Sequence, residues 1–320
     1  MHLKEVLEHY ASVTSKQVAE TSVPEWMLGC FKRRSITFAN GLTDKQTHVF
    51  WLQGRNLTID LRLPVESEQV QKLAWQECDA DELARLANYE GWSADSQWQH
   101  EQLSWSGGVS FQVHNRWPEP AKLNRIGDCM MEFAPSGAYV EDWRLQSHLP
   151  GPLVSLRLIE ERDESSGELR HQGGALIITG NWAGLVLGRV QAIEEDASEQ
   201  QLRDRLSLAG GDPAFKAKVF NFETSVAQGS LDDGFTTRFS TRFFRLEQPT
   251  FSLQGFRFDQ QNNQLVQHFS QGDTGIIRRF TIDSLEQHYP FTRTSPWTPE
   301  AQAWFEQERE TLGRYLSPLN

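Results

Sequence analysis

Leu57-Thr58-Ile59-Asp60-Leu61-Arg62-Leu63 is the stretch that decides the fold of this chain. Its apolar residues occupy every second position and alternate with polar ones, which is the pattern of a β-strand with one buried face. If such strands close into a barrel, the polar face either lines the lumen or faces water. The alternation predicts the strand and leaves these two alternatives open.

Short strands separated by turn residues follow along most of the chain. Residues 47–63 are predicted to form a hairpin that turns at Gln53-Gly54-Arg55-Asn56, and further turns are expected at Ser106-Gly107-Gly108 and Ala134-Pro135-Ser136-Gly137. A second apolar ladder runs over residues 175–189. Closely spaced strands of this kind favour an antiparallel meander. The predicted fold class is therefore all-β, an antiparallel β-barrel with a second β-rich unit and a few peripheral helices.

A charged segment over residues 193–209 is predicted to be a helix that divides the chain. We expect a barrel domain over residues 1–209 and a second β-rich domain with a C-terminal helix over residues 210–320. The chain contains about 15 predicted strands, whereas a small closed barrel needs about eight. This excess favours two β units over one enlarged barrel.

Acidic residues dominate the charge of the chain. Asp and Glu total 43 against 31 Lys and Arg, which gives a net charge of −12. Such a surface repels phosphate backbones and anionic lipid, so neither nucleic acid nor a membrane is expected as a partner. The three cysteines form no CxxC pair and no Cys/His cluster. We therefore expect a reduced, cytoplasmic protein with no metal site and no cofactor.

Carboxylates gather on two neighbouring predicted strands. Asp128 and Glu132 would share one face of the first strand, and Glu141 would lie on the second. Crowding in a low-dielectric lumen raises the pKa of at least one carboxyl group, which suits a general acid or base. His100, in a Trp-rich predicted strand, is a fourth candidate for such a role. Structural pairing of the acids with arginines is the alternative interpretation. The chain contains no GxSxG elbow and no phosphate-binding GxxxxGK(S/T) loop.

Several of these segments resemble lipocalin-like (calycin) barrels, and are particularly similar to a fungal lipocalin-like family built from two β units. The segments are Phe50-Trp51-Leu52-Gln53 with residues 57–62, Gly127-Asp128-Cys129, Glu141-Asp142-Trp143 and Ile177-Ile178-Thr179-Gly180-Asn181-Trp182. The resemblance implies a lumen that holds a small, partly apolar molecule. The ligand-binding residues it implies are Trp51, Arg62, Trp98, Trp105, Trp143 and Trp182.

Three classes of function remain open for such a scaffold. The first is a binding protein whose partner is a small-molecule ligand, with a homodimer as a further expectation. The second is an enzyme of the lyase, isomerase or hydratase type that uses acidic residues in the lumen. The third is a protein-interaction module with a filled barrel. Fold alone does not decide among them.

Overall fold

The computed structural model describes residues 1–13, 21–193, 201–291 and 298–314. Within these ranges the chain is mostly β-structure, as predicted, and its strands form two separate sheets. The first part of the predicted charged helix, residues 194–200, lies outside the described residues. Its remainder forms α3 (Leu202–Leu208).

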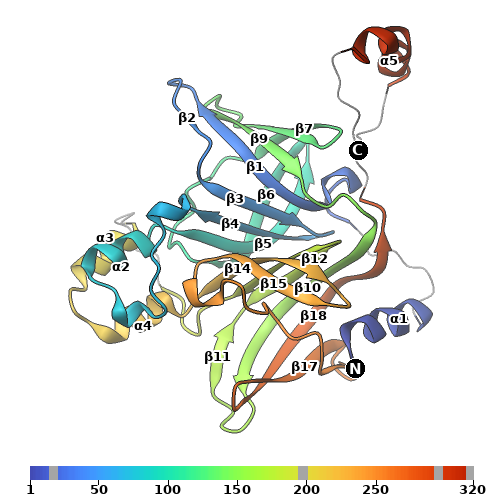
Figure 1. Cartoon of the computed structure of the whole chain (residues 1–320). Coiled ribbons are helices and arrows are strands. Elements are labelled where there is room, and N and C mark those ends of the chain that lie inside the picture. Colours follow the sequence, from blue (N-terminus) through green and yellow to red (C-terminus); the bar gives the residue numbers. More distant parts are fainter. Residues whose placement is uncertain (14–20, 194–200, 292–297, 315–320) are drawn as a thin grey trace.

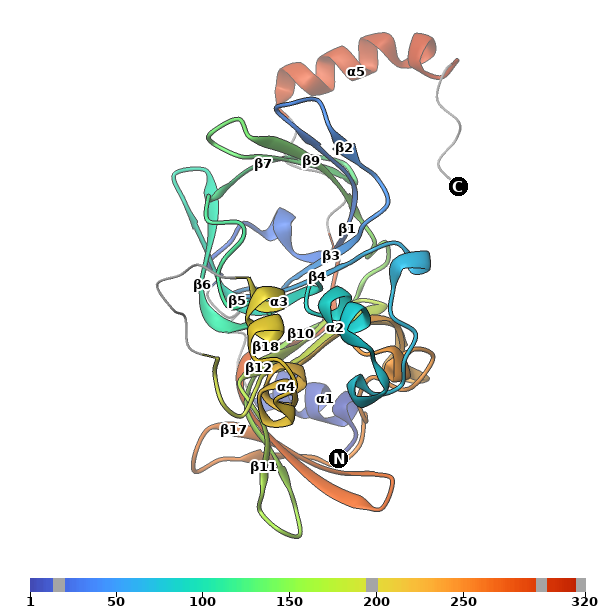
Figure 2. The same ribbon diagram turned by 90° about the vertical axis from the view of Figure 1, so that its left-hand side faces the viewer.

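Eight antiparallel strands of the first sheet close into a barrel (Figure 1). They follow one another in sequence order, and the last strand pairs back onto the first, from Phe31 opposite Leu145 to Phe38 opposite Tyr139. The view in Figure 2 looks into the resulting ring of strands. The barrel strands are β1 (Gly29–Phe38), β3 (His48–Gln53), β4 (Leu57–Leu63), β5 (Glu90–Gln99), β6 (Gln102–Ser110), β7 (Ala121–Ile126), β8 (Cys129–Phe133) and β9 (Tyr139–Leu145), and the short β2 (Thr43–Asp44) pairs with β1.

The second sheet is antiparallel and wraps beside the barrel (Figure 1). Its path runs β15-β14-β13-β12-β10-β18-β17-β16, and β11 pairs with β10. Within the described residues no pairing joins the two ends of this path, so the sheet is open. Its strands are β10 (Gly151–Asp163), β11 (Leu169–Gln172), β12 (Gly174–Thr179), β13 (Trp182–Leu187), β14 (Glu223–Ser230), β15 (Gly234–Ser240), β16 (Phe256–Asp259), β17 (Gln264–Gln271) and β18 (Thr274–Tyr289).

The change from one sheet to the other lies between β9 and β10, well before residue 209. Strands β10 to β13 precede that residue and β14 to β18 follow it, yet all of them belong to the second sheet. The expected division at residues 209 and 210 therefore does not coincide with the change of sheet. Whether either part folds as an independent domain stays a prediction.

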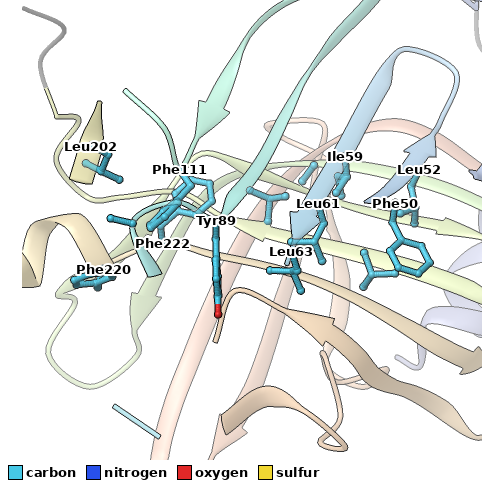
Figure 3. Packing of buried hydrophobic residues seen from close by; sticks show 14 of the residues in the cluster. Phe50, Leu52, Ile59, Leu61, Leu63, Tyr89, Phe111, Leu202, Phe220 and Phe222 are labelled. Atoms are coloured by element: carbon cyan, nitrogen blue, oxygen red, sulfur yellow. The ribbon is translucent and has the colours of Figure 1, made fainter. Parts of the chain in front are cut away.

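One face of the second sheet packs against the outside of the barrel, and the buried residues between them form what we call the interface layer (Figure 3). The alternating apolar residues of β4, which are Leu57, Ile59, Leu61 and Leu63, all belong to it. Gly184 of β13 allows the close approach, because a Cβ at this position would lie 3.2 Å from methyl groups of both Ile59 and Leu52. The layer includes Phe50, Leu57, Ile59, Leu61, Leu63, Tyr89, Phe111, Ile177, Trp182, Val186, Phe220, Phe222 and Val226.

Helices lie outside the two sheets. α1 (Leu3–Val13) packs Leu3, Val6 and Leu7 into a second core on the other face of the second sheet. Asp79 caps α2 (Ala80–Leu86) in a capping box with Glu82, as its spacing predicts. No helix in the described part of the chain combines the length and apolar character needed to cross a membrane. The others are α4 (Pro213–Phe220), α5 (Pro299–Leu312), η1 (Glu25–Met27), η2 (Glu66–Glu68), η3 (Trp75–Glu77) and η4 (Phe243–Arg245).

Candidate functional site

A cavity of about 460 Å³ occupies part of the barrel lumen. Exposed residues of β6, such as Ser106 and Ser110, belong to its wall, so the cavity opens to solvent there. Aromatic side chains supply much of the remaining wall. They are Trp51, Trp92, Trp105, Trp117, Tyr139, Trp143 and Phe222.

Strand alternation places the polar residues of β4 in this lumen. Leu61 points outward into the interface layer, whereas Asp60 and Arg62 line the cavity. In the register of the sheet, Asp60 lies between Trp51 of β3 and Trp92 of β5. The three side chains therefore share the inner face of neighbouring strands. The polar face of β4 thus lines the lumen at Asp60 and Arg62 and does not face outward into water.

Four tryptophans of the wall pack edge to face on one another. The ring of Trp51 lies 5.8 Å from that of Trp143 and 6.5 Å from that of Trp105, and Trp92 lies 5.7 Å from Trp105, at interplanar angles of 71° to 82°. Edge-to-face contacts are favourable for aromatic rings and hold each ring in one orientation. The cavity thus has a preformed aromatic wall.

Arg62 and Asp60 form an ion pair in the lumen. Arg62 Nε donates to Asp60 Oδ1 at 2.9 Å, and the guanidinium lies 4.4 Å from the centroid of the Trp117 ring. Burial raises the pKa of Asp60, and the opposing effect of Arg62 does not cancel this shift. Arg62 Nη1 is buried and has no hydrogen-bond acceptor among the described residues.

The loop between β6 and β7 places Trp117 over Arg62. Trp117 Nε1 donates to Glu90 at 3.0 Å, and Arg116 Nη1 donates to the same carboxylate at 2.9 Å. Trp117 also meets Tyr139 edge to face at 5.5 Å. These contacts hold the Trp117 side chain in place in the cavity wall.

Glu132 is the second buried acid of the cavity wall. It lies directly opposite Glu141 on the neighbouring strand and accepts a hydrogen bond from Trp143 Nε1 at 3.0 Å. Burial, followed by the charge of Glu141, raises the pKa of Glu132 well above its ordinary value. Glu141 instead pairs with Arg33, whose Nη1 lies 2.7 Å from its carboxylate. Glu132 therefore retains its proton under conditions in which an exposed glutamate is ionised.

The indole nitrogens of the wall differ in their partners. Trp51 Nε1 donates to Gln53 Oε1 at 3.1 Å, while the indole nitrogens of Trp117 and Trp143 donate to the side chains of Glu90 and Glu132. Trp105 Nε1 is buried and has no acceptor among the described residues. Gln53 in turn accepts from Thr58 at 2.5 Å, in a buried network to one side of the cavity.

The segment that follows β13 of the second sheet contributes Arg189 to the cavity wall. Its guanidinium donates to the backbone carbonyls of Ser110 and Phe111 at 2.9 and 2.8 Å, and it lies 5.1 Å from the rings of Phe111 and Phe222. Burial lowers the pKa of Arg189 to about 9. Arg189 therefore links the second sheet to the end of β6, beside the opening of the cavity.

Five residues expected at the site lie outside the cavity wall, and one of them is Glu141, which pairs with Arg33. His100 is exposed in the turn between β5 and β6, and Asp128 is part of the turn between β7 and β8, with 40% of its side chain exposed. Trp98 packs edge to face on Trp26 at 5.8 Å. Trp182 belongs to the interface layer, where its ring lies 5.7 Å from that of Phe50. The cavity wall thus includes Trp51, Arg62, Trp105, Glu132 and Trp143 from the expected set.

Sequence reasoning missed Glu90 and Trp117. Glu90 has the same strand parity as Trp92, so an earlier start for the predicted strand would have placed it in the lumen. Trp117 lies in a loop without periodicity, and no local signal indicates its position.

The described residues contain no group of three or more His, Cys, Asp or Glu side chains arranged to hold a metal ion. Comparisons with protein-family models, with curated proteins and with solved structures give no match for this chain.

Proposed function

We propose that this chain is a lipocalin-like binding protein that holds a small, partly apolar molecule in the barrel lumen. The observation that carries the proposal is the cavity of about 460 Å³ with its preformed tryptophan wall. Its volume lies in the range of roughly 300–1,000 Å³ that is typical of small-molecule sites. An aromatic wall with a few fixed polar groups is also typical of such sites.

The topology supports the lipocalin-like part of the proposal. Eight antiparallel strands in sequence order, closed by pairing of the last with the first, form an up-and-down barrel. Lipocalins use this architecture to enclose one small ligand. A filled barrel, which the protein-interaction alternative requires, does not agree with the cavity.

Native mass spectrometry of the protein purified from cells tests the proposal. We expect an added mass that is released on denaturation. Ser110→Trp narrows the exposed part of the cavity wall and should reduce the bound fraction, whereas Ser104→Trp, on an exposed position of the same strand outside the wall, should not. Equal occupancy of both variants would place the molecule outside the lumen, and a mass equal to that of the bare chain would count against the proposal.

Acid–base catalysis on the bound molecule is a second candidate function, favoured by the position of Glu132 in the cavity wall and by burial, which raises its pKa. Glu132→Gln keeps the shape and removes the transferable proton. If the protein converts its ligand, the wild type and this variant should co-purify with different molecules, which the mass and the chromatographic retention of the released compound distinguish. The same molecule on both proteins would argue for binding alone.

A further inference from the structure

The charges of the cavity wall leave one arginine without a counter-charge. Arg62 Nε lies 2.9 Å from the Asp60 carboxylate, and Arg116 Nη1 lies 2.9 Å from that of Glu90. Arg189, the third arginine of the wall, forms no ion pair with any residue that the structure describes. A partly buried charge without an opposite charge nearby is unfavourable, so this part of the wall favours a negatively charged group.

Glu132, the third acid of the wall, does not supply this counter-charge. It lies on β8 and accepts a hydrogen bond from Trp143 Nε1 at 3.0 Å. Burial raises its pKa well above the ordinary value, which disfavours the negatively charged form. The pKa of Arg189 is in turn lowered by burial, and no carboxylate of the described residues opposes that shift.

The surroundings of Arg189 hold its guanidinium in one orientation and leave part of its hydrogen-bonding capacity unused. Nε donates to the backbone carbonyl of Val219, Nη1 to that of Ser110 and Nη2 to that of Phe111, at 2.8 to 2.9 Å. The rings of Phe111 and Phe222 each lie 5.1 Å from the guanidinium carbon. A guanidinium carries five N–H groups, so one on each terminal nitrogen remains for a further acceptor.

This guanidinium lies at the opening of the cavity and beside its aromatic wall. Ser110, the acceptor of Nη1, is exposed and lies directly opposite Trp92 in the ladder of β5 and β6. The Trp92 ring lies 5.7 Å from the Trp105 ring. An anionic group at Arg189 would therefore keep part of its hydration, which limits the cost of its desolvation, while the body of the same molecule meets the tryptophans.

We infer that the cavity binds a small aromatic acid, with its carboxylate or similar anionic group beside Arg189 at the opening and its apolar part against the tryptophans. This inference rests on the proposed function, because it names the chemical class of the molecule that the same cavity holds. The charge of Arg189 supplies the selectivity, since a charge-assisted hydrogen bond is roughly twice as strong as one between neutral groups.

Three naphthalene probes test the inference by equilibrium dialysis near pH 7. They carry a carboxylate, a carboxamide or an aminomethyl group at the same ring position. The carboxylate and carboxamide probes have nearly the same shape, and only the first is negatively charged. We expect the carboxylate probe to bind about tenfold more tightly than the carboxamide probe, and the positively charged aminomethyl probe to bind most weakly.

Three variants connect this preference to Arg189. Arg189→Met removes the charge and keeps a long side chain, so it should cancel the advantage of the carboxylate probe over the carboxamide probe. Arg189→Lys keeps the charge and should retain part of that advantage. Arg238→Met is the control for the loss of one positive charge, because Arg238 lies outside the cavity wall, and it should retain the advantage in full.

The outcomes separate the inference from the proposed function. Equal affinities of the wild type for the carboxylate and carboxamide probes, or tightest binding of the aminomethyl probe, would overturn the inference and leave binding in the lumen intact. This comparison decides even if Arg189→Met does not fold, which thermal unfolding reveals. An unchanged advantage of the carboxylate probe in a folded Arg189→Met would also overturn the inference. If none of the three probes binds, the proposed binding of partly apolar molecules fails together with it.

Discussion

The Arg62–Asp60 ion pair offers the sharpest test of the lumen. Arg62 Nε lies 2.9 Å from Asp60 Oδ1, and the two side chains are 12% and 4% exposed. At an effective dielectric constant of about 20, two unit charges about 4 Å apart attract each other by about 4 kcal/mol. Removing one partner of a buried pair leaves the other charge uncompensated, which typically costs about 3–5 kcal/mol. The two estimates agree in size.

We therefore expect Arg62→Met to lower the free energy of unfolding by about 3–5 kcal/mol near pH 8. The loss should be smaller near pH 5, because Asp60, whose pKa burial already raises, then takes up a proton more readily. The double variant Asp60→Asn/Arg62→Met should lose less than the sum of the two single variants. Urea unfolding of the four proteins of this cycle, followed by tryptophan fluorescence, measures the coupling energy.

An exposed ion pair provides the control. Arg238 Nη1 lies 2.6 Å from Glu247 Oε2, but these side chains are 42% and 67% exposed. The same cycle with Arg238→Met and Glu247→Gln should give a coupling energy below about 1 kcal/mol. If the lumen pair couples no more strongly than this surface pair, Arg62 is well hydrated and the reasoning about a poorly solvated cavity is refuted.

Three further predictions concern other parts of the molecule. Burial raises the folded-state pKa of Glu132, so the stability that its protonated form contributes is lost as the pH rises through that value. In denaturant unfolding, the free energy of unfolding of Glu132→Gln should equal that of the wild type near pH 5 and exceed it near pH 9. A difference between the two proteins that does not change with pH would contradict a buried acid. A Cβ at Gly91 would lie 2.4 Å from Thr224 Oγ1, so Gly91→Ala should lower the free energy of unfolding by about 1–3 kcal/mol, while Gly211→Ala, in open space, should not. Trp182→Ala should cost about 3–5 kcal/mol yet leave binding in the lumen unchanged, and selective loss of binding would place Trp182 at the site instead.

Local patterns predicted the first hairpin well. The expected turn at residues 53–56 separates β3 from β4, and the alternation of β4 assigns its two faces correctly. The same rule could not place Trp182, because every residue of β13 is buried. A strand that is buried on both faces has no polar face to contrast with an apolar one. Its side chains can be assigned to a core or a lumen only when the neighbouring sheets are known.

The position of the turn between β5 and β6 explains why His100 was predicted to lie inside a strand. Ser106-Gly107-Gly108, expected as a turn, lies within β6 at a shift of register, where a Cβ on Gly108 would lie 1.8 Å from the carbonyl oxygen of Ser93. The hairpin instead turns at His100 and Glu101, with φ angles of +52° and +60°. Glycine in a strand marks a bulge as often as a turn, and residues with side chains adopt positive φ only rarely. The sequence predicted His100 inside a strand for this reason.

A similar difference moves Asp128 away from Glu132. Asp128 and Glu132 are predicted to share one strand, but Gly127 adopts a φ of +58° and the chain turns there between β7 and β8. Asp128 is thus at the end of the hairpin and Glu132 is within the barrel wall. Local patterns also could not assign strands to sheets, because some paired strands lie far apart in the sequence. One example is β10, which pairs with β18 and places Gly151 opposite Tyr289.

The second sheet explains how a barrel of eight strands can keep a polar, hollow interior. Such a barrel is just wide enough for side chains to fill, and filling it is the usual source of its stability. Here only part of the lumen is packed, by apolar residues such as Phe31 and Met130. The outward face of β4 and its neighbours instead buries its apolar residues in the interface layer, against the second sheet. Alternate residues of one strand therefore have different surroundings: Ile59 and Leu61 pack in the interface layer, and Asp60 and Arg62 line the cavity.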